Sequence, residues 1–257
     1  MHNRYIPACL AFLAVLLMCK SLQAASCLVV LDNLEQGAVI QRYDTEQPRQ
    51  LSASESYTKV NDCSQLKLVR GVIHVVYENK NGVTRKTCRD PNKLCNIDTG
   101  HWPSWLDVFR PQPSAGGHKA IARLPGIPSG KIFSPEKAAI FNMAKAGLTQ
   151  WNLTLLDAVS KKPIYRQSGS APVVQVPLNL LRPGGKYNLV IEGSNQRYKG
   201  GFSILGGTEA EDIAKQIRQV NTDASATVRA RKLDELIIFY NNNLDYEVEL
   251  LREDLNV

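Results

Sequence analysis

The hydrophobic residues of this chain begin as one continuous stretch and then divide into short segments. The stretch from Ile6 to Met18 carries no charge and follows Arg4. A cationic start, a short apolar run and a small-residue exit form the layout of a secretory signal peptide. The run is also shorter than the about 20 residues that span a bilayer. We therefore expect cleavage near Ala24, which removes residues 1–24, and a periplasmic or secreted mature chain with no stable membrane span.

Cys27 lies shortly after this cut and raises the question of a lipoprotein. A lipid-attachment site carries Leu or a similar residue three positions before the cysteine, and Ala24 stands at that position here. We expect soluble export and keep lipidation at Cys27 as the less favoured alternative.

Short β-like runs separated by turn residues follow the leader. The runs are Cys27–Leu31, Ala38–Arg42, Leu66–Val69, Val72–Tyr77 and Val83–Cys88. The pair Asn81-Gly82, between the last two runs, supplies the positive φ angles that a tight hairpin needs. We predict a small antiparallel β domain over residues 25–98.

Residues 25–98 contain a series of short motifs in a defined order. The motifs are Gly37–Ile40, Leu51-Ser52, Lys59–Asp62, Leu66–Leu68 and Val75–Tyr77, followed by a glycine hairpin. This order resembles the β-repeat of FecR-type periplasmic domains, although Ser54 and Asn61 stand where that family usually has glycines. FecR-type domains have no catalytic residues to carry over, so the resemblance implies a non-enzymatic envelope module.

Residues 99–130 change in composition to Trp, Pro, Gly and Ser. Five prolines lie in the segment from Trp102 to Pro128. Because proline interrupts both helices and strand ladders, this segment is expected to form a linker between domains.

Short strands return over residues 131–206. They are expected at Ala138–Asn142, Leu148–Leu156, Pro163–Arg166, Val173–Leu178, Tyr187–Ile191 and Gly201–Leu205. Trp151, Leu153 and Leu155 share one face of an alternating strand, with Asn152 and Thr154 on the other. Repeated short strands of this kind favour a β-sandwich.

A turn motif before one of these strands adds to the fold prediction. Leu181, Pro183, Gly184 and Tyr187 form the pattern L-x-P-G-x-x-Y. The pattern resembles the tyrosine corner of immunoglobulin-like and fibronectin type III sandwiches, which implies that the Tyr187 hydroxyl bonds to upstream backbone. The expected fold class is mainly β, with a small antiparallel β domain, an immunoglobulin-like sandwich and a C-terminal α-helical hairpin.

Helical periodicity begins after Gly207 and is expected to occupy residues 207–257. Thr208 and Glu211 are spaced as a capping box for a first helix that ends near Val220. Apolar residues at helical spacing predict a second helix over residues 223–240, and a third follows from Tyr246 to Leu255. The segment 236–251 resembles half a tetratricopeptide unit, which cannot bury its apolar face alone. The helices therefore pack either on the rest of this chain or on another protein.

Four cysteines remain after cleavage, and an even number in an exported protein predicts disulfides. Of the three possible connectivities we favour Cys27–Cys63 with Cys88–Cys95. A metal site formed by Cys88, Cys95 and His101 has a spacing that fits no common zinc pattern. We expect no metal and no cofactor.

Catalytic and nucleic-acid signatures are absent from the sequence. It contains no P-loop, no dinucleotide fingerprint, no H-E-x-x-H and no nucleophile elbow. Its basic runs are short and interrupted, which argues against nucleic acid as a partner. The candidate binding surface is the segment with Trp102, Trp105 and Phe109, whose rings could present a platform to a glycan or a protein. The alternative is that these rings fill the seam between the two β domains.

These features together predict an exported, non-enzymatic adaptor that acts through contact with an envelope protein partner. An alternative is a cell-wall or glycan-binding module that uses Trp102 and Trp105. A third hypothesis, ranked below both, is an envelope enzyme whose site no motif reveals.

Overall fold

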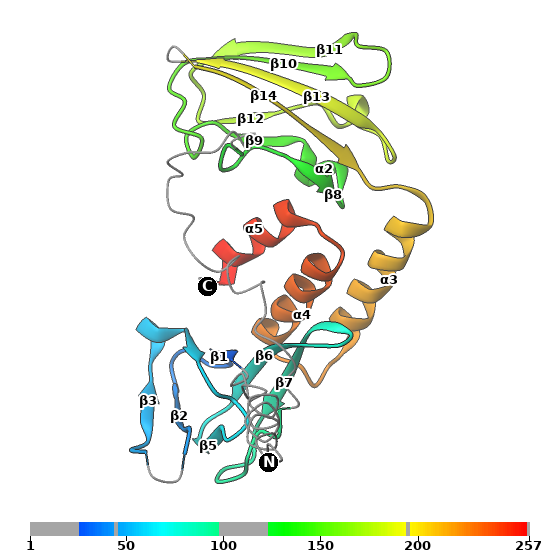
Figure 1. Cartoon of the computed structure of the whole chain (residues 1–257). Helices are drawn as coiled ribbons and strands as arrows, with labels where there is room; N and C mark the ends of the chain where they lie inside the picture. The colour runs from blue at the N-terminus through cyan, green and yellow to red at the C-terminus, as the bar shows by residue number, and fades with distance from the viewer. Residues whose placement is uncertain (1–25, 44–45, 98–122, 194–195, 256–257) are drawn as a thin grey trace, which may run out of the picture.

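The computed structural model describes residues 26–43, 46–97, 123–193 and 196–255. The expected signal peptide and the Trp-rich segment lie outside the described residues. The described chain is mainly β, with more residues in strands than in helices, and it ends in helices (Figure 1). The predicted fold class is therefore confirmed at that level. Among the described residues, every helix is too short or too polar to span a bilayer.

The N-terminal β unit contains two antiparallel sheets. One sheet has the order β4-β1-β6-β7 and the other has the order β3-β2-β5. Their strands are β1 (Cys27–Leu31), β2 (Ala38–Gln41), β3 (Arg49–Leu51), β4 (Tyr57–Val60), β5 (Lys67–Arg70), β6 (Ile73–Asn79) and β7 (Gly82–Cys88); a short 3-10 turn, η1, covers Ala53–Glu55. Every residue of β1 is buried, which explains why its sequence is a continuous apolar run rather than an alternating one.

Both predicted disulfides are confirmed within this unit. Cys27 bonds to Cys63 with a Cα–Cα distance of 6.0 Å, and Cys88 bonds to Cys95 with a distance of 5.7 Å. The first joins the start of β1 to the turn after β4, and the second closes the segment that follows β7. Three of the four cysteines are less than 4% exposed, so these bonds belong to the core of the unit.

The second β unit is a two-layer sandwich. A five-stranded sheet has the order β11-β10-β13-β14-β8, and a two-stranded sheet pairs β12 with β9. The strands are β8 (Gly130–Ile132), β9 (Ile140–Asn142), β10 (Trp151–Asp157), β11 (Pro163–Gly169), β12 (Val173–Gln175), β13 (Lys186–Gly193) and β14 (Gln196–Ile204); the 3-10 turn η3 covers Leu178–Leu180. Phe141 and Val174 of the small sheet share one core with Trp151 and Leu153 of the large sheet, so apolar packing between the layers holds the sandwich together.

The turn before β13 is held by a hydrogen bond to the side chain of Tyr187. Tyr187 is 3% exposed, and its hydroxyl accepts a hydrogen bond from Arg182 N at 2.8 Å. Gly184 has a φ of +75°, a conformation that glycine adopts without strain, and its N–H donates to Ile204 O at 3.0 Å. Leu181 is buried beside the same core. The residues of the L-x-P-G-x-x-Y motif thus fasten the entry of β13 to the end of β14.

Replacing Tyr187 by Phe should lower the free energy of unfolding by about 1 to 2 kcal/mol, because the Arg182 N–H loses its acceptor in a partly buried turn. Urea unfolding measures the change. Tyr57→Phe is the matched control, since Tyr57 is 37% exposed. An equal, negligible effect of both substitutions would contradict a role for the Tyr187 hydroxyl.

The helical part differs in two details from the sequence prediction. It comprises α2 (Pro135–Ala138), which lies inside the sandwich unit, and then α3 (Gly207–Thr222), α4 (Val228–Asn241) and α5 (Asp245–Leu255). The prediction of a capping box at Thr208 and Glu211 was wrong. The helix α3 begins at Gly207, and its N-cap is Gly206, which makes no side-chain cap hydrogen bond. The start of the second helix was also wrong. Thr227 caps α4 by accepting from Ala230 N, while the Asp223 carboxylate holds the preceding residues in a turn.

The helices lie between the two β units (Figure 1). Leu28 and Val30 of β1 pack in one apolar cluster with Leu233 and Leu236 of α4. Tyr246 of α5 joins the sandwich core, and its hydroxyl donates to Ile140 O at 3.2 Å. The C-terminal helices therefore pack on the β units of their own chain, and this packing covers the apolar helix faces for which the sequence predicted no partner.

Candidate functional site

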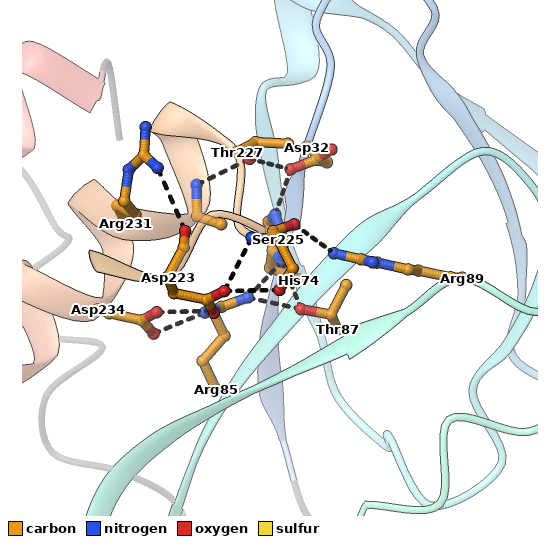
Figure 2. A network of polar contacts seen from close by, with 11 residues as sticks. Asp32, His74, Arg85, Thr87, Arg89, Asp223, Ser225, Thr227, Arg231 and Asp234 are labelled. Carbon is orange, nitrogen blue, oxygen red and sulfur yellow. Dashed lines mark hydrogen bonds and ion pairs between the residues drawn. The ribbon is translucent and has the colours of Figure 1, made fainter. Parts of the chain in front are cut away.

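A polar network crosses the interface between the N-terminal β unit and the helices (Figure 2). Asp32 follows β1, His74 lies on β6, and Arg85 and Thr87 lie on β7. His74 is paired with Thr87 and Val76 with Arg85 in the antiparallel ladder. Because cross-strand partners and alternate residues share a face, these side chains point to the same side of the sheet.

His74 sits at the centre of this network and is fully buried. Its Nε2 lies 2.6 Å from Asp32 Oδ1, and Arg85 Nη1 lies 2.9 Å from its Nδ1. A guanidinium can only donate, so Nδ1 is the acceptor and the ring proton is on Nε2, where it is donated to Asp32. The imidazole is therefore neutral in this arrangement.

The network continues onto α4 through both charged partners of His74. Arg85 binds Asp234 with two parallel hydrogen bonds, from Nε at 2.7 Å and from Nη2 at 2.6 Å. The Thr227 hydroxyl, which caps α4, also donates to Asp32 at 2.5 Å. Bidentate Arg–carboxylate pairs fix orientation as well as distance. The network thus sets the position of α4 on the N-terminal sheet.

The pKa of His74 is lowered from its usual value. Burial is the main cause; the hydrogen bond to Asp32 works in the opposite direction, and the charge of Arg85 adds to the lowering. Lowering the pH through about 6.5 should therefore reduce stability, because the unfolded chain takes up a proton that the native ring resists.

His74→Gln isolates this effect. The Gln amide can donate to Asp32 and accept from Arg85 but does not titrate. Equilibrium unfolding between about pH 7.5 and about pH 5 should show wild type losing stability relative to the variant. Glu247, whose pKa burial raises, gives a slope of opposite sign in both proteins and cancels in the comparison. Parallel stability curves would contradict the prediction.

Opposite charges join the other side of the helices to the sandwich. Residues 131–206 contain ten Lys and Arg residues but only three Asp and Glu residues. Residues 207–257 contain six Lys and Arg residues and eleven Asp and Glu residues. Lys145 contacts Glu249 at 2.7 Å and also pairs with Glu253, and Lys131 contacts Glu209 at 2.9 Å. The acidic helices therefore neutralise the cations at the end of the sandwich that faces them.

On the outer face of the five-stranded sheet, Lys131 of β8 is neutralised in this way by Glu209, but the cations of the other strands are not. Thr154 points outward on β10, and its ladder partners are Arg166 on β11 and Val190 on β13. Val190 is paired in turn with Lys199 on β14. The exposed Arg166 and Lys199 therefore stand on one row across four strands. Neither has an ion pair with any described residue.

Two further cations of β13 and β14 share this outer face. Lys186 is exposed and alternates with the buried Tyr187, while Arg197 pairs with Glu192 at 3.1 Å. Glu192 is the one acidic side chain that this face places beside four basic ones, within the described strands. We call this surface, formed by Arg166, Lys186, Arg197 and Lys199, the basic face.

Beside the basic face, β11 forms an end of its sheet. It pairs with β10 on one side, and its other side has no strand partner among the described residues. The last four residues of β11, Arg166–Gly169, are exposed. Lys161 and Lys162 in the preceding turn are exposed as well. Backbone donors and acceptors along this edge thus open onto a basic environment.

The basic face is not the surface that the sequence predicted. Trp102, Trp105 and Phe109 lie outside the described residues, so the structure does not place them. The four cysteines and Leu181, Pro183, Gly184 and Tyr187 do lie in described segments, and there they stabilise the fold. In the sequence, the residues of the basic face are visible only as single Lys and Arg residues that alternate with apolar residues. Their clustering on one surface becomes apparent only when the strands are placed in register. Within the described residues, no group of three His, Cys, Asp or Glu side chains could hold a metal ion.

Comparison with known proteins gives no family for this chain. No protein-family model matches it, and no curated protein shows significant sequence similarity to it.

Proposed function

We propose that this protein is an exported, non-enzymatic adaptor that binds a protein partner in the cell envelope through its second β unit. The observation that carries the proposal is the exposed basic face next to the free edge of β11. Clustered charge of one sign steers and selects an oppositely charged partner. The leader-like N-terminus and the two disulfides support export to an oxidising compartment.

The fold supports a role as a rigid connector. The helices pack against both β units, with apolar contacts and the Arg85–Asp234 pair on one side and the Lys145 ion pairs on the other. A partner bound at the basic face is therefore held at a fixed position relative to the N-terminal β unit. We propose that the latter is a FecR-like module.

We also propose that the second β unit is an immunoglobulin-like sandwich. The large sheet contains β11-β10-β13-β14 in that order, and β9 pairs with β12 in the opposite layer. The buried Trp151 on β10 and the Tyr187 hydrogen bond before β13 agree with that architecture. Sandwiches of this kind commonly present sheet edges and loops to protein partners.

Reversing two charges of the basic face tests the proposed function. Chains of residues 25–257 are immobilised as wild type, as Arg166→Glu/Lys199→Glu, and as Lys80→Glu, an exposed control on the N-terminal unit. Each is incubated with chemically cross-linked envelope extract, and bound proteins and glycans are identified. We expect a protein partner whose recovery falls about tenfold with the double variant and is unchanged with the control.

Two results would contradict the proposal. One is retention of the same proteins by all three chains, and the other is recovery of a glycan without a protein. The second would favour the glycan-binding alternative and direct attention to Trp102 and Trp105. Truncation after Gly207 is not a suitable test, because it would uncover Leu28 and Val30, which α4 buries.

A further inference from the structure

We infer that the partner binds as an acidic, extended segment that adds a strand to the free edge of β11. This inference rests on the proposed function and specifies the chemistry of the partner at the same site. Two features of the described residues carry it: the open edge and the row of cations beside it.

The open edge supplies the main-chain part of the interaction. In an antiparallel pair, alternate residues direct their N–H and C=O groups toward the partner strand, and the residues between them direct theirs away. β11 therefore presents unpaired backbone groups on the side opposite β10. An extended peptide satisfies such groups by joining the sheet, which is a recurring mode of peptide recognition. Figure 1 shows β10 and β11 at the end of the molecule farthest from the N-terminal β unit, where a strand can approach.

The cations determine which peptide is favoured. A strand next to β11 would lie about 4.8 Å from it, and its outward side chains would stand beside Arg166. Lys199 lies three strand spacings from Arg166 on the same row, or about 14 Å, and continues the positive potential across the face. Lys161 and Lys162 extend it past the start of β11. Asp and Glu are therefore expected at the outward positions.

The opposite positions of the added strand face a different environment. Tyr165 is paired with the buried Leu155, faces inward beside Arg166, and is half-buried against the sandwich core. An apolar side chain from the added strand would extend this core at the edge. The expected ligand thus carries acidic residues at alternate positions and an apolar residue beside Tyr165, over a length of about seven positions that matches β11.

A lipid surface or an anionic polysaccharide fits these features less well. Either could contact the cations, but neither offers the alternating donors and acceptors that pair with a strand edge. The cations could also serve only to keep the edges of two copies apart, a common use of Lys and Arg on edge strands. The experiment separates these alternatives.

The probe is a displayed library of random twelve-residue peptides, selected on the immobilised chain of residues 25–257. Enriched sequences are synthesised and titrated against wild type, Arg166→Glu/Lys199→Glu and Lys80→Glu. Hydrogen–deuterium exchange then locates the amides that each peptide protects. The melting temperature of every variant is measured first, so that loss of binding is not loss of fold.

We expect enriched peptides with Asp or Glu at alternate positions and an apolar residue at one of the positions between them. Their affinity should fall about tenfold with the double variant and should also fall with added salt, while Lys80→Glu behaves as wild type. Amides of residues 163–169 should become protected in the complex. Protection of β11 is the readout that a purely electrostatic contact would not produce.

Several results would overturn the inference. They are enrichment of peptides without acidic residues, protection confined to segments other than β11, and binding to phosphatidylglycerol vesicles with no peptide selected. A dimer in sedimentation that the double variant abolishes would show instead that the face binds a second copy. If the extract yields a partner that depends on the basic face but acidic peptides fail, the proposed function stands and strand addition falls. If acidic peptides bind but the extract yields no partner, the reverse holds.

Discussion

Replacing Arg85 by Ala is expected to lower the free energy of unfolding by about 3 kcal/mol. Arg85 is 13% exposed in its side chain and binds Asp234 through two hydrogen bonds. It also donates to Thr87 and to the Nδ1 atom of the buried His74. Its removal leaves Asp234 without its cation and leaves His74 Nδ1 with the Thr87 hydroxyl, at 3.1 Å, as its remaining donor, in surroundings that water reaches poorly. The contact between α4 and the N-terminal sheet should therefore weaken.

A double-mutant cycle measures how much of this loss belongs to the ion pair. Denaturant unfolding is carried out on Arg85→Ala, Asp234→Ala and the combined variant. The combined variant should lose less than the two single changes together, because no unpaired charge remains. Lys93→Ala is the matched control, since the pair of Lys93 with Asp90 is mostly exposed and should contribute less than about 1 kcal/mol. Additive single effects would show that the Arg85–Asp234 pair contributes no coupling energy and that Arg85 acts through its other contacts.

Removing the disulfide between Cys27 and Cys63 should have the largest effect in the N-terminal unit, about 4 kcal/mol. The two residues are 36 positions apart, and both are fully buried. In the chain-entropy account, opening this loop increases the freedom of the unfolded chain. The measurement is denaturant unfolding of Cys27→Ala/Cys63→Ala, with the midpoint and the slope both determined.

Cys88→Ala/Cys95→Ala is the comparison for that prediction. Its two cysteines are separated by 7 positions, so the loss should be smaller, about 2.5 kcal/mol. Equal losses for the two pairs, or a larger loss for the shorter loop, would mean that native packing rather than loop length determines the contribution. Mass spectrometry of the wild type confirms that both bonds are formed before unfolding.

Strands and helices with a strong local pattern were predictable, and weak ones were not. The Trp151, Leu153, Leu155 alternation marked β10, because a half-buried strand requires that pattern. By contrast β3, β4 and β8 have three or four residues each and mixed polarity, so no periodicity reveals them. Ala138 was expected to begin a strand, but Ser134 caps the short helix α2 there, with Pro135 at its first position.

The start of α3 could not be predicted from a local sequence motif. Thr208 and Glu211 have the right spacing for a capping box, yet the chain enters α3 through Gly206. A Cβ on Gly206 would clash with the backbone of Gly184, so close packing between two turns determines that entry. A contact of this kind joins residues from different parts of the chain and leaves no local mark.

The candidate site depended almost entirely on the folded arrangement. Arg85 and Asp234 are 149 positions apart, and each looks like an ordinary surface charge in its own segment. The same holds for Arg166 and Lys199, which belong to one row because four strands align in register. The positions of charged residues along one strand do not predict a charged surface when the neighbouring strands and their register are unknown.

Local physics explains which properties could be derived without the fold. Cysteine number and spacing and apolar periodicity indicated two disulfides and a mainly β chain with C-terminal helices, since each depends on neighbouring residues or on composition. The docking of the helices between the β units, the neutral His74 and the basic face beside an open edge required the three-dimensional structure. These properties arise from burial and from contacts between distant segments, and such contacts exist only once the chain has folded.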